Sequence, residues 1–263
     1  MNRLVLPLVI LLAIAAAVAA AWYYLDRSFR GAGAARGGET VSEQRALSPF
    51  TRLSVGGLAD ITLVQGDTES VRFEVPAKQM RRVRIEVRDG TLHVDNHSSD
   101  NLMSFLFGGA TQPIRATVTF RDLNAIDVSG AVKLRADGWK TEKLALSISG
   151  EAKIAIAGLE AKELAIAASG AVKAEIAGRA TDQRIAISGA GSYRAPELAS
   201  DTARVAVSGA GKVVVNAAKT LKVSISGAGS VEYLGDPKVT EDISGVGRVR
   251  RRESALDARH VIA

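Results

Sequence analysis

Seven serines recur at nearly equal spacing, each followed directly by glycine, and a serine hydroxyl can act as a catalytic nucleophile. To do so it needs a general base, most often histidine, within hydrogen-bond reach. The three histidines, His93, His97 and His260, all lie outside the repeated segment. We therefore interpret the serines as turn residues whose hydroxyls hydrogen-bond along the turn, and the glycines as sites of positive φ or close backbone approach. The turn residues are Ser129, Gly130, Ser149, Gly150, Ser169, Gly170, Ser188, Gly189, Ser208, Gly209, Ser226, Gly227, Ser244 and Gly245.

A basic residue stands four positions after most of these serines. In stacked repeats such residues would form a column of like charges, which is tolerated only if it is solvated or paired with anions. One interpretation is that the column is a solvated, charged edge of the solenoid that resists aggregation. The other is a surface that binds an acidic glycan or an anionic lipid headgroup. The candidate anion-binding residues are Lys133, Lys153, Lys173, Lys212 and Arg248.

The acidic residues do not form an obvious catalytic group. Polysaccharide lyases and hydrolases need carboxylates clustered with basic or metal partners. Glu151 and Glu175 come from adjacent repeats but fall in different columns, and the absence of cysteine excludes thiolate metal sites and cysteine nucleophiles. The sequence therefore predicts a protein that is not an enzyme and has no cofactor or metal site. A polysaccharide lyase or hydrolase is the remaining catalytic alternative.

The spacing of the Ser-Gly pairs predicts the fold. Successive serines are 18–20 residues apart, and each repeat contains two short runs in which large apolar residues alternate. Alternation is the period of a β-strand. Two strands cannot bury a face alone, but stacked repeats can pair equivalent strands in parallel, and such crossovers are right-handed. We predict an all-β, single-stranded right-handed parallel β-helix, a solenoid with about seven Ser-Gly-marked coils.

Equivalent residues of stacked repeats should form columns. Large apolar residues stand directly before the serines and two positions earlier, and these are the predicted core. The small residues between them should form a flat outward strip, which either packs against neighbouring chain or offers a contact face. The predicted core residues are Ile148, Ala168, Ile187, Val207, Ile225, Ile243, Leu146, Ile166, Ile185, Val205 and Val223. The strip residues are Ser147, Ala167, Ala186, Ala206 and Ser224.

The N-terminal segment predicts export from the cytoplasm. Residues 4–25 carry no charge and are long enough to cross a bilayer, which takes about 20 residues. The Trp-Tyr-Tyr group at 22–24 suits a membrane interface, whereas the alanines at 19–21 suit signal cleavage. Residues 1–25 are thus either a single transmembrane helix anchored in the inner membrane or a signal peptide removed on secretion. Both place the remaining chain outside the cytoplasm, in the periplasm or cell envelope if the helix anchors it, or secreted if the signal peptide is cleaved.

The rest of the chain divides by composition. A Gly- and Ala-rich segment at 26–46 is predicted to be a flexible linker. Residues 47–128 are predicted to form divergent first coils and a cap, with a hairpin insertion. The regular repeats follow at 129–252, and 253–263 form a tail.

Two features bear on partners. An apolar stretch at 102–107 is expected to cover a side or end of the solenoid, or else to contact a membrane or a partner. The net charge is +6, with an arginine cluster at Arg248, Arg250, Arg251 and Arg252 that we interpret as a solvated basic end. Nucleic acid is not an expected partner, because the cluster lacks interleaved aromatic residues and any recognisable module. Envelope glycan, lipid or protein remains.

Several short segments of the sequence resemble those of a known bacterial family. They are LSVGGLADITLVQGD at 53–67, VRDGTLHVDN at 87–96, the repeated SGAGK and SGAGS, and GDPKVTEDISGVGRVR at 235–250. Together they are similar to the family described as putative auto-transporter adhesin, head GIN domain, from about Leu47 to Arg252. The resemblance implies an extracytoplasmic β-helical domain with no established activity. It implies no catalytic residues.

Overall fold

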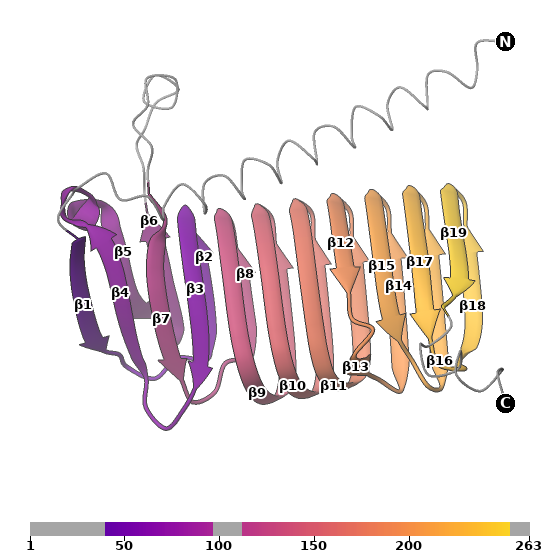
Figure 1. Cartoon of the computed structure of the whole chain (residues 1–263), viewed down its shortest axis with the longest axis horizontal. Coiled ribbons are helices and arrows are strands. Elements are labelled where there is room, and N and C mark those ends of the chain that lie inside the picture. The colour runs from indigo at the N-terminus through magenta and orange to yellow at the C-terminus, as the bar shows by residue number, and fades with distance from the viewer. Residues whose placement is uncertain (1–39, 97–111, 253–263) are drawn as a thin grey trace, which may run out of the picture.

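The protein is a solenoid of stacked β-strands, seen in a computed structural model that describes residues 40–96 and 112–252 (Figure 1). The prediction of an all-β solenoid is confirmed. The described elements are β1 (Thr40–Ala46), β2 (Arg52–Gly56), β3 (Leu58–Gln65), β4 (Ser70–Pro76), the 3-10 helix η1 (Ala77–Arg82), β5 (Val83–Arg88), β6 (Thr91–Asn96), β7 (Ile114–Phe120), β8 (Ala125–Val128), β9 (Ala131–Ile148), β10 (Glu151–Ala168), β11 (Ala171–Ile187), β12 (Ala190–Arg194), β13 (Leu198–Ala199), β14 (Thr202–Val207), β15 (Ala210–Asn216), β16 (Thr220–Ile225), β17 (Ala228–Leu234), β18 (Lys238–Ile243) and β19 (Val246–Arg251).

Each coil has two faces that meet at its Ser-Gly pair, which we call the corner. The pre-corner face consists of β6, β2, β8, the second halves of β9 to β11, and then β14, β16 and β18; from β8 on, each of these runs into a corner. The post-corner face consists of β7, β3, the first halves of β9 to β11, and then β12, β15, β17 and β19; from β9 on, each of these leaves a corner. Strands within each of these rows pair in parallel.

The seven corners bound six complete turns, and the solenoid is of the right-handed type. In the middle coils β9, β10 and β11 run through both faces as single strands of 17 or 18 residues. Gly138 and Gly158 lie where β9 and β10 pass from one face to the other, with φ of +70° and +63°. Glycine suits these bends because positive φ costs it no steric strain.

Inward columns of apolar side chains fill the space between the two faces. The predicted core residues are confirmed with one exception, since all but Ile243 are at most 3% exposed. Ile243 is 39% exposed because it belongs to the last coil that the structure describes, and no further described strand covers it. On the pre-corner face the strip of small residues lies outward, as predicted.

The corner glycines permit close approach between coils. Their φ values are not positive, so the first of the two expected reasons for glycine is wrong here. A Cβ built on Gly150 or Gly170 would lie less than 3.0 Å from the carbonyl group of the glycine one coil earlier. The backbones come so near because each corner carbonyl accepts a bond from the next coil: Glu151 N–H donates to Gly130 O at 2.9 Å.

The first layers are not stacked in chain order. The β2–β3 layer lies between the β6–β7 layer and the layer formed by β8 and the first half of β9. Its corner, Gly56-Gly57, takes the place of a Ser-Gly pair. The predicted hairpin is present as β5 and β6, joined at Asp89 and Gly90. Antiparallel strands finish this end of the solenoid, with β4 and β1 on one face and β5 on the other.

The expected linker at 26–46 ends earlier than the sequence indicated. Residues 40–46 form β1, whose backbone pairs along its whole length with β4. The expected anchor or signal peptide at 1–25, the apolar stretch at 102–107 and the tail at 253–263 lie outside the described residues. No helix within 40–96 and 112–252 is long and apolar enough to span a membrane.

Candidate anion-binding face

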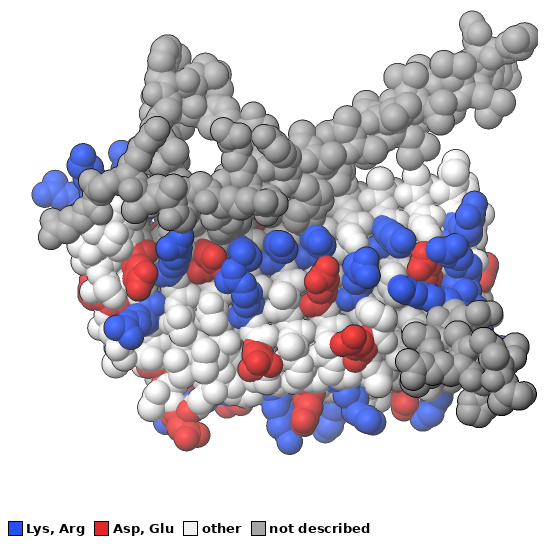
Figure 2. Space-filling model, in the orientation of Figure 1, with Lys and Arg blue, Asp and Glu red and all other residues white. Residues whose placement is uncertain are grey.

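The predicted basic column lies on the outside of the post-corner face. Lys133, Lys153 and Lys173 are in register on β9, β10 and β11. Their side chains point outward because the residues on either side, such as Val132 and Leu134, point into the core. The same column continues through Ser192, Lys212, Ser230 and Arg248. Figure 2 shows a belt of basic side chains crossing this face from one end of the solenoid to the other. The structure thus brings all five predicted basic residues into one line.

Acidic side chains accompany the basic column at intervals. Asp60 on β3 continues the column before Lys133 and receives a hydrogen bond from Arg135 at 2.7 Å. Glu175 stands beside Lys173, with the carboxylate 3.5 Å from the ammonium nitrogen. The pair of Glu175 with Lys173 was not predicted from the sequence. The spacing Lys173-Ala-Glu175 could have revealed the pairing, since residues two apart lie on one side of a strand.

Lys153 occupies the centre of the column. Among the described residues it makes no ion pair, and it is flanked by Lys133 and Lys173 on the adjacent strands. Adjacent strands are about 4.8 Å apart, so three ammonium groups stand within reach of one polyanionic group.

Glu232 is the most enclosed carboxylate of this face. Its side chain is only 5% exposed although its position on β17 points outward. Arg250 donates to it at 2.6 Å and the Lys212 ammonium lies 3.3 Å away. The Arg250 hydrogen bond is the main reason that the pKa of Glu232 is lowered, with Lys212 adding to it against the opposing effect of burial. The carboxylate therefore joins three coils: those of Lys212, Glu232 and Arg250.

Glu232→Gln should destabilise the solenoid at neutral pH by about 1–2 kcal/mol, because the charge-assisted bonds to Arg250 and Lys212 are lost. A lowered folded-state pKa means that the carboxylate stabilises the fold above the ordinary Glu range. That contribution disappears as pH falls through the lowered pKa. Denaturant melts of both proteins between pH 7 and pH 3 check this. The gap between them should close on acidification, and a constant gap would contradict the assignment.

A shallow groove of about 690 Å³ runs beside the basic column on the same face. Its floor includes Ala155, Ala157 and Ala177, and its rim includes Arg135 and Arg194. Small side chains leave room along the backbone, so a chain-like ligand could lie in the groove with its anionic groups turned to the column.

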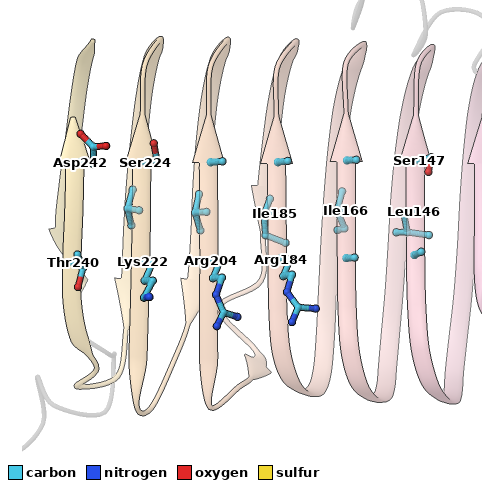
Figure 3. Close-up of a pocket in the computed structure, with 17 residues that line it drawn as sticks. Leu146, Ser147, Ile166, Arg184, Ile185, Arg204, Lys222, Ser224, Thr240 and Asp242 are labelled. Atoms are coloured by element: carbon cyan, nitrogen blue, oxygen red, sulfur yellow. The ribbon is translucent and has the colours of Figure 1, made fainter. Parts of the chain in front are cut away.

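A second groove, of about 630 Å³, lies on the pre-corner face (Figure 3). The strip of small residues lies along it, and Arg184, Arg204 and Lys222 form a row along one side. Two of these cations are engaged: Arg184 donates to Glu163 at 3.0 Å, and Arg204 lies 3.8 Å from Asp182.

The corner serines lie in a row along the edge where the two faces meet. The hydroxyls of Ser149, Ser169 and Ser188 each donate to the backbone carbonyl of the residue before the preceding corner serine, at 3.3–3.4 Å. His93, the only histidine among the described residues, lies on β6 opposite Ser54. Within 40–96 and 112–252, no three acidic or histidine side chains are grouped so that they could hold a metal ion.

Comparison with known proteins gives a matching family model and several solved structures with a similar fold. Residues 49–237 match the family model described as putative auto-transporter adhesin, head GIN domain. A comparison with curated proteins gives no match. The fold is similar to that of a putative adhesin from Bacteroides fragilis, with a TM-score of 0.74 and 20% identity over 82% of this chain and 98% of that one. It is also similar to a putative lipid binding protein from Parabacteroides distasonis, with a TM-score of 0.65 and 16% identity over 83% and 98%.

Proposed function

Because the chain belongs to the putative auto-transporter adhesin, head GIN domain family, we propose that it is a non-catalytic adhesive module of the cell envelope that binds anionic groups along its basic column. The groups are phosphates or carboxylates, carried by an acidic glycan or by lipid headgroups. The proposed location is outside the cytoplasm, as the N-terminal segment and the family both indicate. The names of the similar solved structures, adhesin and lipid binding protein, agree with a binding role.

The register of Lys133, Lys153 and Lys173 on three adjacent strands carries this proposal. Like charges directly opposite each other on neighbouring strands destabilise a sheet. A ligand with regularly spaced anionic groups removes that repulsion on binding, and it gains from several contacts at once. The solenoid is suited to such a ligand because its coils repeat along a line, as the ligand does.

Replacing Lys133, Lys153, Lys173 and Lys212 together with glutamine should reduce retention on immobilised lipopolysaccharide or on an acidic polysaccharide by at least about tenfold, a loss of about 1.4 kcal/mol. The matched control replaces four lysines at the opposite edge of the coils, Lys140, Lys143, Lys162 and Lys219, which pair with acids of their own. Both variants lose the same charge, so the control corrects for net charge alone.

Comparing the two matrices distinguishes the two sources of anionic groups. Binding to acidic polysaccharide alone favours a glycan, and binding to phosphorylated lipid alone favours a headgroup. Equal retention of the wild type, the column variant and the control on both matrices would remove the basic column from the proposal.

A further inference from the structure

The two ends of the solenoid are finished in different ways. At the N-terminal end the outermost described strands run antiparallel to their neighbours, with β1 on one face and β5 on the other. At the C-terminal end β18 pairs only with β16, and β19 only with β17, among the described residues. Their outer edges therefore present backbone N–H and C=O groups in the arrangement that pairs readily with another strand. Figure 1 shows both strands at the end opposite β1.

Apolar side chains are exposed at this end. Val246 at the start of β19 is 74% exposed, and Ile243 at the end of β18 is 39% exposed. One coil earlier, the residue in register with Ile243 is Ile225, which is fully buried. Two inward columns end in charged side chains, because Glu241 stands in register with the core residue Val223 and Arg251 stands in register with Tyr233.

The charges of the two edge strands are opposite. β18 carries Glu241 and Asp242 close to its corner, and β19 carries Arg248, Arg250 and Arg251. Pairing β19 with another β19 would oppose arginine to arginine, which is unfavourable. Pairing β18 with β19 opposes acid to base. The charges therefore permit one combination of edges and disfavour the others.

The geometry of a coil makes this combination available to a second copy of the chain. Within one coil β18 runs into the corner and β19 runs out of it, so the two strands point in opposite directions. A twofold axis parallel to the strands brings β18 of one copy antiparallel to β19 of its partner, and β19 to β18 at the same time. Both open edges are satisfied by one contact.

We propose that the C-terminal end of the solenoid is a self-association surface, through which two copies join end to end with β18 of each paired to β19 of the other. The contact uses the same patch on both copies, so it closes as a dimer. In the dimer both β18 and β19 of each copy are paired, so this end offers no open edge to a third copy. The dimer presents two basic columns along one extended body.

A charge exchange tests the pairing in the full-length chain, purified in mild detergent. One variant carries Glu241→Lys with Asp242→Lys, and the other carries Arg248→Glu with Arg251→Glu. Arg250 is left intact because it holds Glu232. Each variant alone opposes like charges, so its dimer dissociation constant, measured by analytical ultracentrifugation, should rise at least about tenfold. Mixing the two variants restores opposite charges at both edges and should restore dimers.

Cysteine cross-linking gives a second measurement, and the natural chain contains no cysteine to confuse it. A Thr240→Cys chain mixed with an Arg248→Cys chain should give cross-linked dimers with a short bismaleimide, whereas neither chain alone should. Three results would overturn the proposal: a wild type that stays monomeric at tens of micromolar, a mixture of charge variants that stays monomeric, or a Thr240→Cys chain that cross-links to itself. Dimers that form only after removal of residues 253–263 would also overturn it, since the tail would then be the natural occupant of this end.

Discussion

Gly170→Ala should lower the free energy of unfolding by about 3 kcal/mol, because the new Cβ has no space between two coils. It would lie less than 3.0 Å from the carbonyl oxygen and carbon of Gly150, which are backbone atoms fixed by their own ladder bonds. One of these, Ala171 N–H to Gly150 O at 3.0 Å, would have to lengthen or break. A methyl group that cannot be accommodated by a side-chain rotation must separate the coils.

The measurement is guanidinium denaturation followed by circular dichroism, with Gly138→Ala as the control. Gly138 has a φ of +70°, but a Cβ there meets no atom within 4 Å. Alanine at that bend should cost only about 1–2 kcal/mol, through backbone strain alone. If the two substitutions cost the same, close approach between coils is not the reason for glycine at the corners.

Gln183→Leu should destabilise the protein by about 2–4 kcal/mol although leucine suits the site by shape. Gln183 is fully buried and stands in register with Leu164 on the neighbouring coil. Its amide oxygen accepts from the Tyr193 hydroxyl at 2.9 Å, and its amide nitrogen donates to Ser200 Oγ at 2.9 Å. Burial raises the pKa of Tyr193, so this hydroxyl remains a donor across the physiological range. Leucine would leave it without an acceptor in the core.

A double-mutant cycle with Tyr193→Phe separates the lost hydrogen bonds from the altered packing. Tyr193→Phe alone should cost about 1 kcal/mol, since it leaves the Gln183 oxygen unpaired while Ser200 keeps its donor. The double variant should be more stable than the sum of the two single effects predicts, because the hydroxyl and its acceptor are then removed together. Strict additivity, measured by the same denaturation, would show that the two side chains act independently.

The corners and the inward columns could be predicted from the sequence because they repeat. A recurrence of 18–20 residues sets the length of one coil, and alternation around Ile148 or Ile187 sets which side chains point inward. In the sequence, the polar network around Gln183 was visible only as a glutamine in an otherwise apolar column that contains Leu164 and Ala203. Its partners, Ser200 and Asn216, lie in the irregular connection after β12 and in the next coil, where no repeat specifies the path.

The candidate site was predictable in part for the same reason. The five basic residues share one repeat position and therefore one column. Their acidic neighbours do not follow the repeat regularly. Asp60 comes from the inserted layer, and the column that holds Glu175 and Glu232 also holds Ala155, Arg194 and Val214. Such pairings depend on which strands lie beside each other. That order follows the chain in the regular coils but not around β2 and β3.

The position of the β2–β3 layer has a consequence for how the molecule is made. Each regular coil adds to one completed about twenty residues earlier, so those coils can assemble one after another in chain order. The β2–β3 layer emerges before any of its neighbours, and both of the layers that sandwich it are synthesised afterwards. Closing the long loops that bring them together is entropically slow. We therefore expect the C-terminal coils to acquire protection from hydrogen exchange first during refolding, and the amides of β2 and β3 to follow only once β7 and β8 have docked on either side.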